Sequence, residues 1–575
     1  MTAEDRYKEW LSDPYFDSAT KEELKEIAQD QKEIQERFYK ELEFGTAGLR
    51  GIIGAGTNRM NKYTVQKATQ GLANYIKKAG LAHKGAVIAY DSRRMSPEFA
   101  REAALCFAGN GIKAYLFDSL RPTPELSFAV RYLHGAAGIN ITASHNPADY
   151  NGYKVYWEDG AQITPPHDSG ITEEVRNIKD FSQVHSMSEE EAGTSPLIEY
   201  IGAEIDDAYI GVLKEQVLNW DAIDRMKDEL EIVYTPLHGA GNLPVRRVLR
   251  ELGYTKVSVV KEQEEPDGEF PTVSYPNPET AEAFELGIKL AKKCKADLIL
   301  ATDPDADRLG IYVRDIKTNE YHPLTGNMAG CLIGDYILAQ KSKKAPLPLN
   351  GVWVKSIVTT PMADAIADYY GIEHVQVLTG FKYIGEKIRE YEKDKSHTYL
   401  FGMEESYGCL PATYARDKDA VVAAMLLCEA AAYYKTMGKT LWDAMSSMYE
   451  RYGFYLDEVK SITLEGMDGR QKMQEIMENL RSNPPTHLGG RKVMILKDYE
   501  ENLIINKKMG ITTETALPKS NVLYYEMEQN EWVAIRPSGT EPKIKIYYGV
   551  KGTSLSDADS RLKKLEKSAV ELLSM

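Results

Sequence analysis

The sequence predicts an α/β protein of four domains, of which three are related and the last is of a different, α+β kind. A chain of 575 residues is far longer than one hydrophobic core supports, so several domains are expected. One pattern recurs along the chain: an apolar run, then Thr-Pro, then residues with helical periodicity. The carboxyl-terminal part instead has several predicted strands in succession. These two observations give the fold class.

The recurring pattern predicts a strand that leads into a helix. Threonine before proline suits an N-cap followed by the first helical position, where the missing proline N–H costs nothing. The prolines are spaced by about one domain length, which favours three related α/β domains. Unrelated strand-to-helix turns remain an alternative. The pattern occurs at residues 114–117 with Thr123-Pro124, at 232–234 with Thr235-Pro236, and at 354–358 with Thr360-Pro361.

The carboxyl-terminal region predicts a sheet of successive strands and a terminal helix. We expect domains at residues 1–205, 206–320, 321–455 and 456–575. Residues 266–278, rich in Glu, Asp, Gly and Pro, predict a long loop within the second domain. The expected strands contain residues 493–496, 522–525, 532–535 and 544–547, and the expected helix has apolar positions at Leu562, Leu565, Val570 and Leu573.

Composition argues against several classes of partner and location. The formal net charge of −16 opposes binding to nucleic acid or to anionic lipid, which need a basic surface. The first fifty residues favour amphipathic helix without a secretory signal. Residues 420–434, interrupted by Glu429, are too short to span a bilayer and predict a buried helix. Five cysteines without a Cys-x-x-Cys pair favour reduced, mostly buried thiols and no zinc site, so a cytoplasmic location is expected.

A candidate nucleophile lies in the motif at residues 142–147, Thr-Ala-Ser-His-Asn-Pro. Ser144 follows an apolar run at 138–141, so it is expected at the carboxyl end of a strand, where α/β sheets place ligands. A serine there can carry a phosphoryl group covalently. For these six residues alone, an ordinary Ser-His-Asn turn, with Pro147 stopping a strand, is the better interpretation. The other motifs favour the functional one.

A candidate metal site lies at residues 303–308, Asp-Pro-Asp-Ala-Asp-Arg. Three carboxylates on alternate residues of a tight turn can converge on one hard cation, and their repulsion is costly without it. Mg²⁺ is the expected metal. An EF-hand is a poor alternative, because Arg308 and Arg314 occupy the places of its glycine and its bidentate glutamate. A solvated acidic turn is the other alternative, but residues 309–313 close the turn in a strand.

Two further motifs suit a phosphorylated sugar. Residues 536–540, Arg-Pro-Ser-Gly-Thr, supply a guanidinium, hydroxyls and backbone N–H groups, the donors that a phosphate dianion requires. Lys543 and Lys545 add charge, although alternation places at least one toward solvent. Glu404 and Ser406, within 402–408, can accept from and donate to sugar hydroxyls. That segment is also typical of a helix N-terminus. Together the motifs point to an enzyme that moves phosphate.

The order and spacing of the motifs resemble those of the α-D-phosphohexomutase superfamily, and of its phosphoglucomutases in particular, over essentially the full length. The resemblance implies a four-domain, heart-shaped architecture with one motif in each domain. It implies that Ser144 is the phosphoserine and, with Asp303, Asp305 and Asp307, a ligand of Mg²⁺. It implies active-site roles for Arg50, His145 and Lys154, and substrate contacts for Arg308, Thr379, Gly380, Glu404, Ser406, Lys418, Arg536, Ser538, Gly539 and Thr540. Which group serves as general base stays open.

The reaction implied is interconversion of glucose 1-phosphate and glucose 6-phosphate through a glucose 1,6-bisphosphate intermediate, which also serves as activator. Alternatives are a mutase for mannose, pentose or amino-sugar phosphates, or a sugar-bisphosphate synthase. A non-catalytic sugar-phosphate sensor and a haloacid-dehalogenase-type phosphatase are more remote, the latter because it leaves Ser144 unused. The expected partner is a phosphosugar, without nucleic acid or membrane, and the oligomeric state stays open between monomer and dimer.

Overall fold

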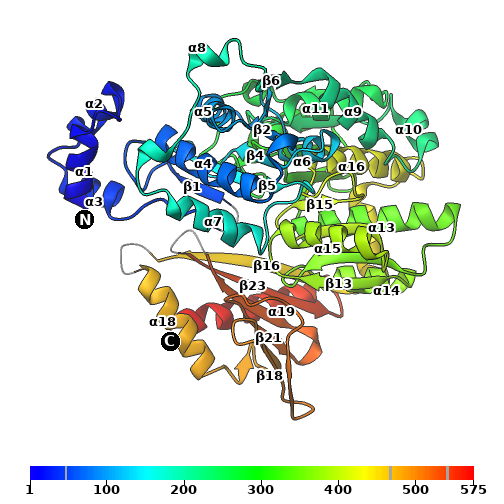
Figure 1. The fold of residues 1–575 in the computed structure, drawn as a ribbon. Helices are drawn as coiled ribbons and strands as arrows, with labels where there is room; N and C mark the ends of the chain where they lie inside the picture. The colour runs from blue at the N-terminus through cyan, green and yellow to red at the C-terminus, as the bar shows by residue number, and fades with distance from the viewer. Residues whose placement is uncertain (46–47, 465–468, 539–542, 575) are drawn as a thin grey trace. The chain divides into compact units, whose positions relative to one another are not determined.

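The computed structural model describes residues 1–45, 48–464, 469–538 and 543–574 (Figure 1). The chain forms two compact units. The first contains residues 1–325, 385–395 and 407–440, and the second contains residues 326–384, 396–406 and 441–575. Within these described ranges, four sheets follow one another in sequence order, three in α/β arrangements and one in the carboxyl-terminal part.

Three short helices open the chain and pack around aromatic side chains. Each begins after a residue whose side chain accepts a backbone N–H, namely Thr2, Asp17 and Asp30. Trp10 and Phe38 lie in the core that these helices share. The expectation of amphipathic helix is therefore confirmed. The helices are α1 (Ala3–Ser12), α2 (Ser18–Glu26) and α3 (Gln31–Phe38).

The first sheet has the order β1-β5-β4-β2-β3-β6. Strand β2 is parallel to β3 and β4, whereas β5 is antiparallel to β1 and β4. Its strands are β1 (Gly48–Ile52), β2 (Ala86–Tyr90), β3 (Ala114–Phe117), β4 (Ala137–Ile141), β5 (Tyr150–Trp157) and β6 (Ile198–Ile201). Its helices are α4 (Lys62–Lys78), α5 (Ser96–Gly109), α6 (Thr123–Tyr132), α7 (His167–Asn177) and α8 (Glu189–Ala192).

The second sheet has the order β11-β10-β9-β7-β8. Residues 266–278 contain neither helix nor strand, which confirms the expected long loop. The strands are β7 (Ile232–Thr235), β8 (Val257–Val259), β9 (Leu298–Thr302), β10 (Leu309–Asp315) and β11 (Glu320–Leu324). The helices are α9 (Ala203–Lys214), α10 (Trp220–Met226), α11 (Asn242–Glu251) and α12 (Glu285–Cys294).

The stretch at 420–434 forms the buried helix that the sequence predicts. Helix α16 (Ala420–Lys435) lies in the first unit with strand β15 (Gly408–Leu410). Asp419 caps it by accepting the N–H groups of Val421 and Val422. Glu429 is also buried, and its carboxylate accepts the N–H of Leu218. The one charged side chain of the apolar run is therefore buried and hydrogen-bonded.

In the second unit, β12 (Gly351–Ser356) pairs in parallel with both β13 (Glu373–Val377) and β14 (Thr398–Glu404). The helices of this part are α13 (Gly326–Lys344), α14 (Met362–Tyr370) and α17 (Leu441–Tyr452), and α15 (Phe381–Asp394) begins here.

The carboxyl-terminal sheet is antiparallel, with the order β16-β23-β22-β21-β18-β19-β20. The four expected strands and the terminal helix are confirmed. The strands are β16 (Phe454–Thr463), β17 (His487–Leu488), β18 (Arg491–Asp498), β19 (Leu503–Asn506), β20 (Ile511–Glu514), β21 (Leu523–Met527), β22 (Trp532–Pro537) and β23 (Lys543–Gly552). The helices are α18 (Gly469–Ser482) and α19 (Leu555–Glu571). Fold class is thus α/β with a distinct carboxyl-terminal sheet domain, as the sequence predicts.

The threonines of the repeated Thr-Pro pattern are not N-caps, and that expectation is wrong at all three places. Helix α6 begins at Thr123 itself, α11 begins only at Asn242, and the N-cap of α14 is Pro361. The hydroxyls of the first two threonines have distant partners instead. Thr123 donates to Asp305, and Thr235 donates to Gln263. Long-range hydrogen bonds therefore replace the local cap.

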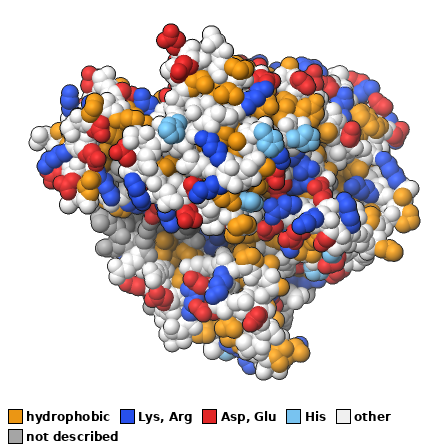
Figure 2. All heavy atoms as spheres, viewed as in Figure 1, with side chains coloured by type: hydrophobic (Ala, Val, Ile, Leu, Met, Phe, Trp, Pro, Cys, Tyr) orange, Lys and Arg blue, Asp and Glu red, His pale blue; other side chains and the backbone are white. Residues whose placement is uncertain are grey.

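The state of the cysteines agrees with the expectation from composition. All five cysteines are free, and four of them are buried. In the described ranges, no helix combines the length and hydropathy needed to cross a bilayer. Figure 2 shows acidic and basic side chains interspersed over the face in view.

Gly48 is the position in β1 where a side chain has no room. Its φ of +115° is unfavourable for other residues, and a Cβ would lie 1.8 Å from the carbonyl oxygen of Tyr153. We expect Gly48→Ala to lower the unfolding midpoint by about 5 °C or more, since strain adds to a backbone clash.

Gly80→Ala is the matched control, because its φ is +73° but a Cβ would meet nothing within 4 Å. It should cost only conformational strain, about 1 to 2 kcal/mol. Thermal unfolding followed by circular dichroism compares the two variants. Equal midpoints for both would show that the close approach of β1 to β5 does not constrain residue 48.

Candidate functional site

Ser144 lies in a tight turn directly after β4. Its backbone has φ of +53°, the left-handed region that non-glycine residues seldom adopt, and its N–H donates to Thr142 Oγ1 at 2.8 Å. The Ser144 hydroxyl donates to Asp303 Oδ2 at 2.6 Å and lies 3.2 Å from His145 Nδ1. The strained turn therefore points the hydroxyl at the acidic motif, although 159 residues separate the two in sequence.

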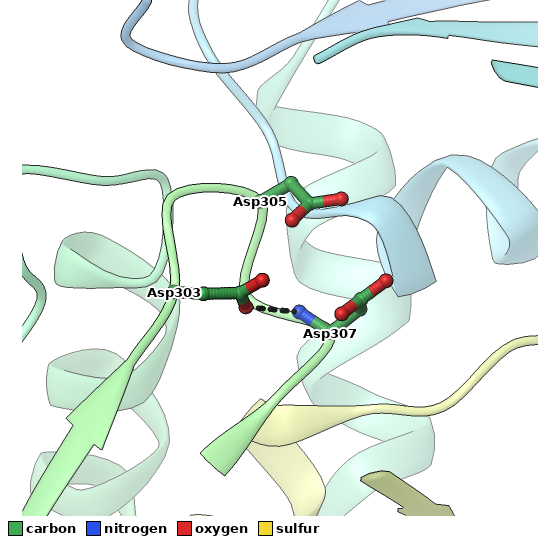
Figure 3. A group of neighbouring side chains, drawn as sticks. All are labelled: Asp303, Asp305 and Asp307. Carbon is green, nitrogen blue, oxygen red and sulfur yellow. Dashed lines mark hydrogen bonds between the residues drawn. The ribbon is translucent and has the colours of Figure 1, made fainter. Parts of the chain in front are cut away.

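The three aspartates of the acidic motif converge in the turn between β9 and β10. Oxygens of Asp303, Asp305 and Asp307 lie within 4.8 Å of one another, and all three residues are buried. Figure 3 shows their carboxylates around a common space, with the N–H of Asp307 donating to Asp303 Oδ1 at 3.1 Å. The solvated-turn alternative is therefore wrong.

Two buried lysines neutralise part of this negative charge. Lys154 Nζ on β5 lies 2.6 Å from Asp305 Oδ2 and 3.2 Å from Asp307 Oδ2. Lys418 Nζ, close before α16, lies 2.9 Å from Asp307 Oδ2. Three distant segments of the first unit thus meet at one set of carboxylates.

The lysines cause the pKa values of the three carboxyl groups to shift in different directions. Burial, followed by repulsion from the other two aspartates, raises the pKa of Asp303 well above its ordinary value. Burial and Asp307 would also raise the pKa of Asp305, but Lys154 and hydrogen bonds outweigh them and lower it. The pKa of Asp307 is lowered too, because Lys154, Lys418 and Arg308 more than offset burial. Asp303, next to Ser144, is thus the carboxyl group that most needs further positive charge.

The donor set fits a hard divalent cation. Asp305 Oδ1 and Asp307 Oδ1 are buried and have no hydrogen-bond partner among the described residues, which is costly for a carboxylate. Three carboxylates and a serine oxygen are the oxygen ligands that Mg²⁺ prefers, especially when phosphate completes its shell. The buried aspartate triad is therefore a candidate Mg²⁺ site.

Thr123 belongs to this site, although sequence reasoning gave it another role. Its hydroxyl donates to Asp305 Oδ2 at 2.6 Å and accepts from Asn140 Nδ2 at 2.7 Å. Its N–H donates to the carbonyl of Asp305 at 2.8 Å. Thr123 is part of the Thr-Pro pattern, but no local sequence signal identifies a hydrogen-bond partner 182 residues away.

Two of the arginines expected at the site contact residues next to the serine turn or follow the acidic turn. Arg50 on β1 donates to Asn146 Oδ1 at 3.1 Å, two residues beyond Ser144. Arg308, directly after the acidic turn, donates to Glu279 Oε1 at 2.5 Å. The first unit thus holds Arg50, Ser144, His145, Lys154, Asp303, Asp305, Asp307, Arg308 and Lys418.

The expected sugar-binding residues lie in the second unit, at the carboxyl end of β14. Glu404 ends this strand and accepts the N–H of Gly380 at 2.7 Å, which brings the two segments together. Thr379 Oγ1 is buried without a hydrogen-bond partner among the described residues. Residues 405–407, including Ser406, form a turn, so the alternative of a helix N-terminus is wrong.

The expected phosphate motif lies at the end of β22. Arg536 is paired in register with Lys545, and the N–H of Ser538 donates to the carbonyl of Lys543 at 2.7 Å. The phenol of Tyr547 is close to this arginine: burial and Glu405 raise the pKa of Tyr547, and Arg536 opposes them. Gly539 and Thr540 lie outside the described residues.

The chain is similar to known proteins over most of its length. Models of the phosphoglucomutase/phosphomannomutase alpha/beta/alpha domains I, II and III match residues 41–181, 207–317 and 325–452. A phosphoglucomutase from Staphylococcus epidermidis is 39% identical over 521 residues, which are 90% of this chain and 92% of the relative. A phosphoglucomutase from Staphylococcus aureus is 37% identical over 541 residues, 94% of this chain and 95% of the relative.

Solved structures show the same fold. A putative phosphomannomutase from Thermus thermophilus has a TM-score of 0.69 at 21% identity, covering 93% of this chain and 100% of its own. The phosphoglucomutase pp63/parafusin from Paramecium, in its open form, has a TM-score of 0.69 at 18% identity, covering 93% and 95%. The chain belongs to the phosphoglucomutase/phosphomannomutase family of the α-D-phosphohexomutases. It is therefore an enzyme of the isomerase class that transfers phosphate.

Asp305→Asn tests the metal site independently of catalysis. Removing one carboxylate charge should weaken Mg²⁺ binding by about tenfold or more, since even second-shell changes cost 10- to 100-fold. Isothermal titration with Mg²⁺ measures it. Asp224→Asn, an exposed residue of α10, is the control and should bind as the unaltered protein does. Equal affinities in all three proteins would place the metal elsewhere.

Proposed function

We propose that the protein interconverts glucose 1-phosphate and glucose 6-phosphate, with Ser144 as phosphoryl carrier and glucose 1,6-bisphosphate as intermediate and activator. The observation that supports this most strongly is the 2.6 Å contact of the Ser144 hydroxyl with Asp303 in a buried triad of aspartates. A nucleophile that must carry a dianionic phosphoryl group needs a cation beside it. The naming of relatives at 37–39% identity as phosphoglucomutases supports glucose as the sugar.

In this proposal Asp303, Asp305, Asp307 and the phosphorylated Ser144 hold Mg²⁺. When bound, the ion would neutralise charge on the phosphoryl group during transfer. The oxygen of a sugar hydroxyl forms a new bond to phosphorus and gives its proton to a general base, while the bond from phosphorus to Ser144 Oγ breaks and Oγ takes up a proton. His145 Nδ1, 3.2 Å from that oxygen, is placed to hold a proton at it.

The remaining charges of the first unit orient the reacting groups. Lys154 and Lys418 hold the acidic turn through their ion pairs with its aspartates. They also supply positive charge near the phosphoryl oxygens. Arg50 and Arg308 contact phosphate or sugar. His145, close to Ser144, is the candidate for the general base, because Asp305 and Asp307 hold Lys154 in its protonated form.

The second unit recognises the substrate in the same proposal. Arg536, with Ser538, Gly539 and Thr540, binds the phosphate that does not react, and Glu404 and Ser406 hold sugar hydroxyls near Thr379 and Gly380. Because one serine acts on both ends of the sugar, the phosphate motif must accept a phosphate on C1 or on C6. The sugar therefore binds in two orientations.

Each of the four proposed domains carries one of these roles. Residues 1–205 carry the phosphoserine, 206–320 the metal ligands, 321–455 the sugar-binding turn and 456–575 the phosphate motif. Because the net charge of −16 would repel an anionic phosphosugar, this cytoplasmic enzyme must bind its substrate through locally concentrated Arg and Lys.

Mannose phosphates are the second candidate substrates, because the matching family models include phosphomannomutases. Turnover of glucose 1-phosphate and mannose 1-phosphate, measured side by side with their bisphosphates and Mg²⁺, decides between them. A higher kcat/KM for mannose 1-phosphate would contradict the assignment of glucose.

Ser144→Ala should lower kcat by about 10⁴-fold or more while leaving the fold intact, because the covalent carrier is lost. A coupled assay of glucose 6-phosphate formation measures this, and circular dichroism checks the fold. Ser446→Ala, on the exposed face of α17, is the control and should keep full activity. Near-normal turnover by Ser144→Ala would refute the role of the serine.

Arg536→Ala should lower kcat/KM about tenfold or more for both glucose 1-phosphate and glucose 6-phosphate. A charge-assisted hydrogen bond contributes about 1.5 to 3 kcal/mol, and both substrates present their resident phosphate to the same motif. Steady-state kinetics in each direction, with the exposed Arg451→Ala as control, measures the effect. Loss toward only one monophosphate would contradict binding in two orientations.

A further inference from the structure

The turn that carries Ser144 encloses a buried arginine from another segment. Arg93 precedes α5, and its side chain is fully buried. Its Nη1 donates to the carbonyls of Pro147 at 2.7 Å and Tyr150 at 3.1 Å, and its Nη2 donates to those of Ser144, at 2.5 Å, and Asn146. One guanidinium thus binds four backbone carbonyls, including that of the proposed carrier.

A second path links the same arginine to the N–H of Ser144. Arg93 Nε lies 3.4 Å from Asp91 Oδ2, which accepts the hydroxyl of Thr142 at 2.6 Å. The Thr142 oxygen in turn accepts the Ser144 N–H at 2.8 Å. Arg93 and Asp91 therefore fix both the N–H and the carbonyl of a residue whose φ of +53° is unfavourable on its own.

The long loop at 266–278 covers this arginine from the second domain. The ring of Phe270, itself buried, lies 5.0 Å from the Arg93 guanidinium carbon. Next to it, Glu269 Oε1 lies 3.2 Å from Arg94 Nε. Just beyond the loop, Glu279 holds Arg308 beside the acidic turn. The loop therefore contacts Arg93, which binds the serine turn, and the residue that follows the loop contacts Arg308, which follows the metal turn.

We infer that Arg93 is a positioning residue that holds Ser144 next to the aspartate triad. The loop at 266–278 fixes the plane of the Arg93 guanidinium. This inference rests on the proposed role of Ser144. A planar fork with five N–H donors suits carbonyls on several sides, whereas an ammonium is a compact charge with three donors. Misplacement of a reacting group by about 1 Å can cost about 10²-fold in rate.

Arg93→Lys and Arg93→Met test this inference. We expect kcat to fall about tenfold or more in Arg93→Lys and about 100-fold in Arg93→Met, because the carrier loses its alignment. The KM for glucose 1-phosphate and the Mg²⁺ affinity should stay within about threefold, since Arg93 contacts neither ligand. A residue that only stabilised the fold would lower the unfolding midpoint and leave kcat of the folded enzyme unchanged.

Arg101→Met, on the surface of α5 with Glu189 as its partner, is the matched control and should keep kcat. If Arg93→Met fails to fold, Arg93→Lys carries the test. A folded Arg93→Lys with kcat within threefold of the unaltered enzyme would overturn the inference.

Mass spectrometry of the unaltered enzyme, after incubation with glucose 1,6-bisphosphate, separates the two possible failures. Phosphate on Ser144 together with normal kcat in Arg93→Lys would overturn only the role of Arg93. Phosphate on another residue would overturn the role of Ser144, and the inference with it.

Discussion

The site depends on three buried carboxylates that repel one another. Lys154 and Lys418 compensate Asp305 and Asp307 within hydrogen-bond distance, whereas Asp303 contacts the Ser144 hydroxyl instead. Burial and repulsion from the other two aspartates raise the pKa of Asp303, so a cation close to Asp303 would relieve the largest part of this repulsion. This asymmetry favours a metal ion beside Ser144, the proposed nucleophile, with the lysines paired to Asp305 and Asp307.

The site is assembled where strands end, as in other α/β proteins. Ser144 follows β4 and Asp303 follows β9, and neither turn forms the site alone. The contacts that join them are long-range: Thr123 to Asp305, Lys154 to Asp305, and Lys418 to Asp307. Placement of the Ser144 hydroxyl therefore depends on the packing of several segments, and the buried Arg93 also binds the backbone of the serine turn.

The sequence predicted the strands and the chemically distinctive motifs well, because each is encoded within a few consecutive residues. It predicted the buried helix at 420–434 for the same reason. It failed for Thr123, which was interpreted as a helix cap but whose hydroxyl binds Asp305 in another domain. Arg93 was missed altogether, because a buried arginine bound to backbone carbonyls has no local pattern. The role of a residue that acts through distant partners can be identified only from the three-dimensional structure.

The central claim is that Ser144 carries the phosphate that the sugar receives. The most direct measurement is a pulse–chase, in which enzyme bearing ³²P on Ser144 is mixed with unlabelled glucose 1-phosphate and quenched within one turnover. We expect the label to leave the protein at the rate of turnover and to appear first in glucose 1,6-bisphosphate. Label that stays on Ser144 while unlabelled glucose 6-phosphate accumulates would contradict the account.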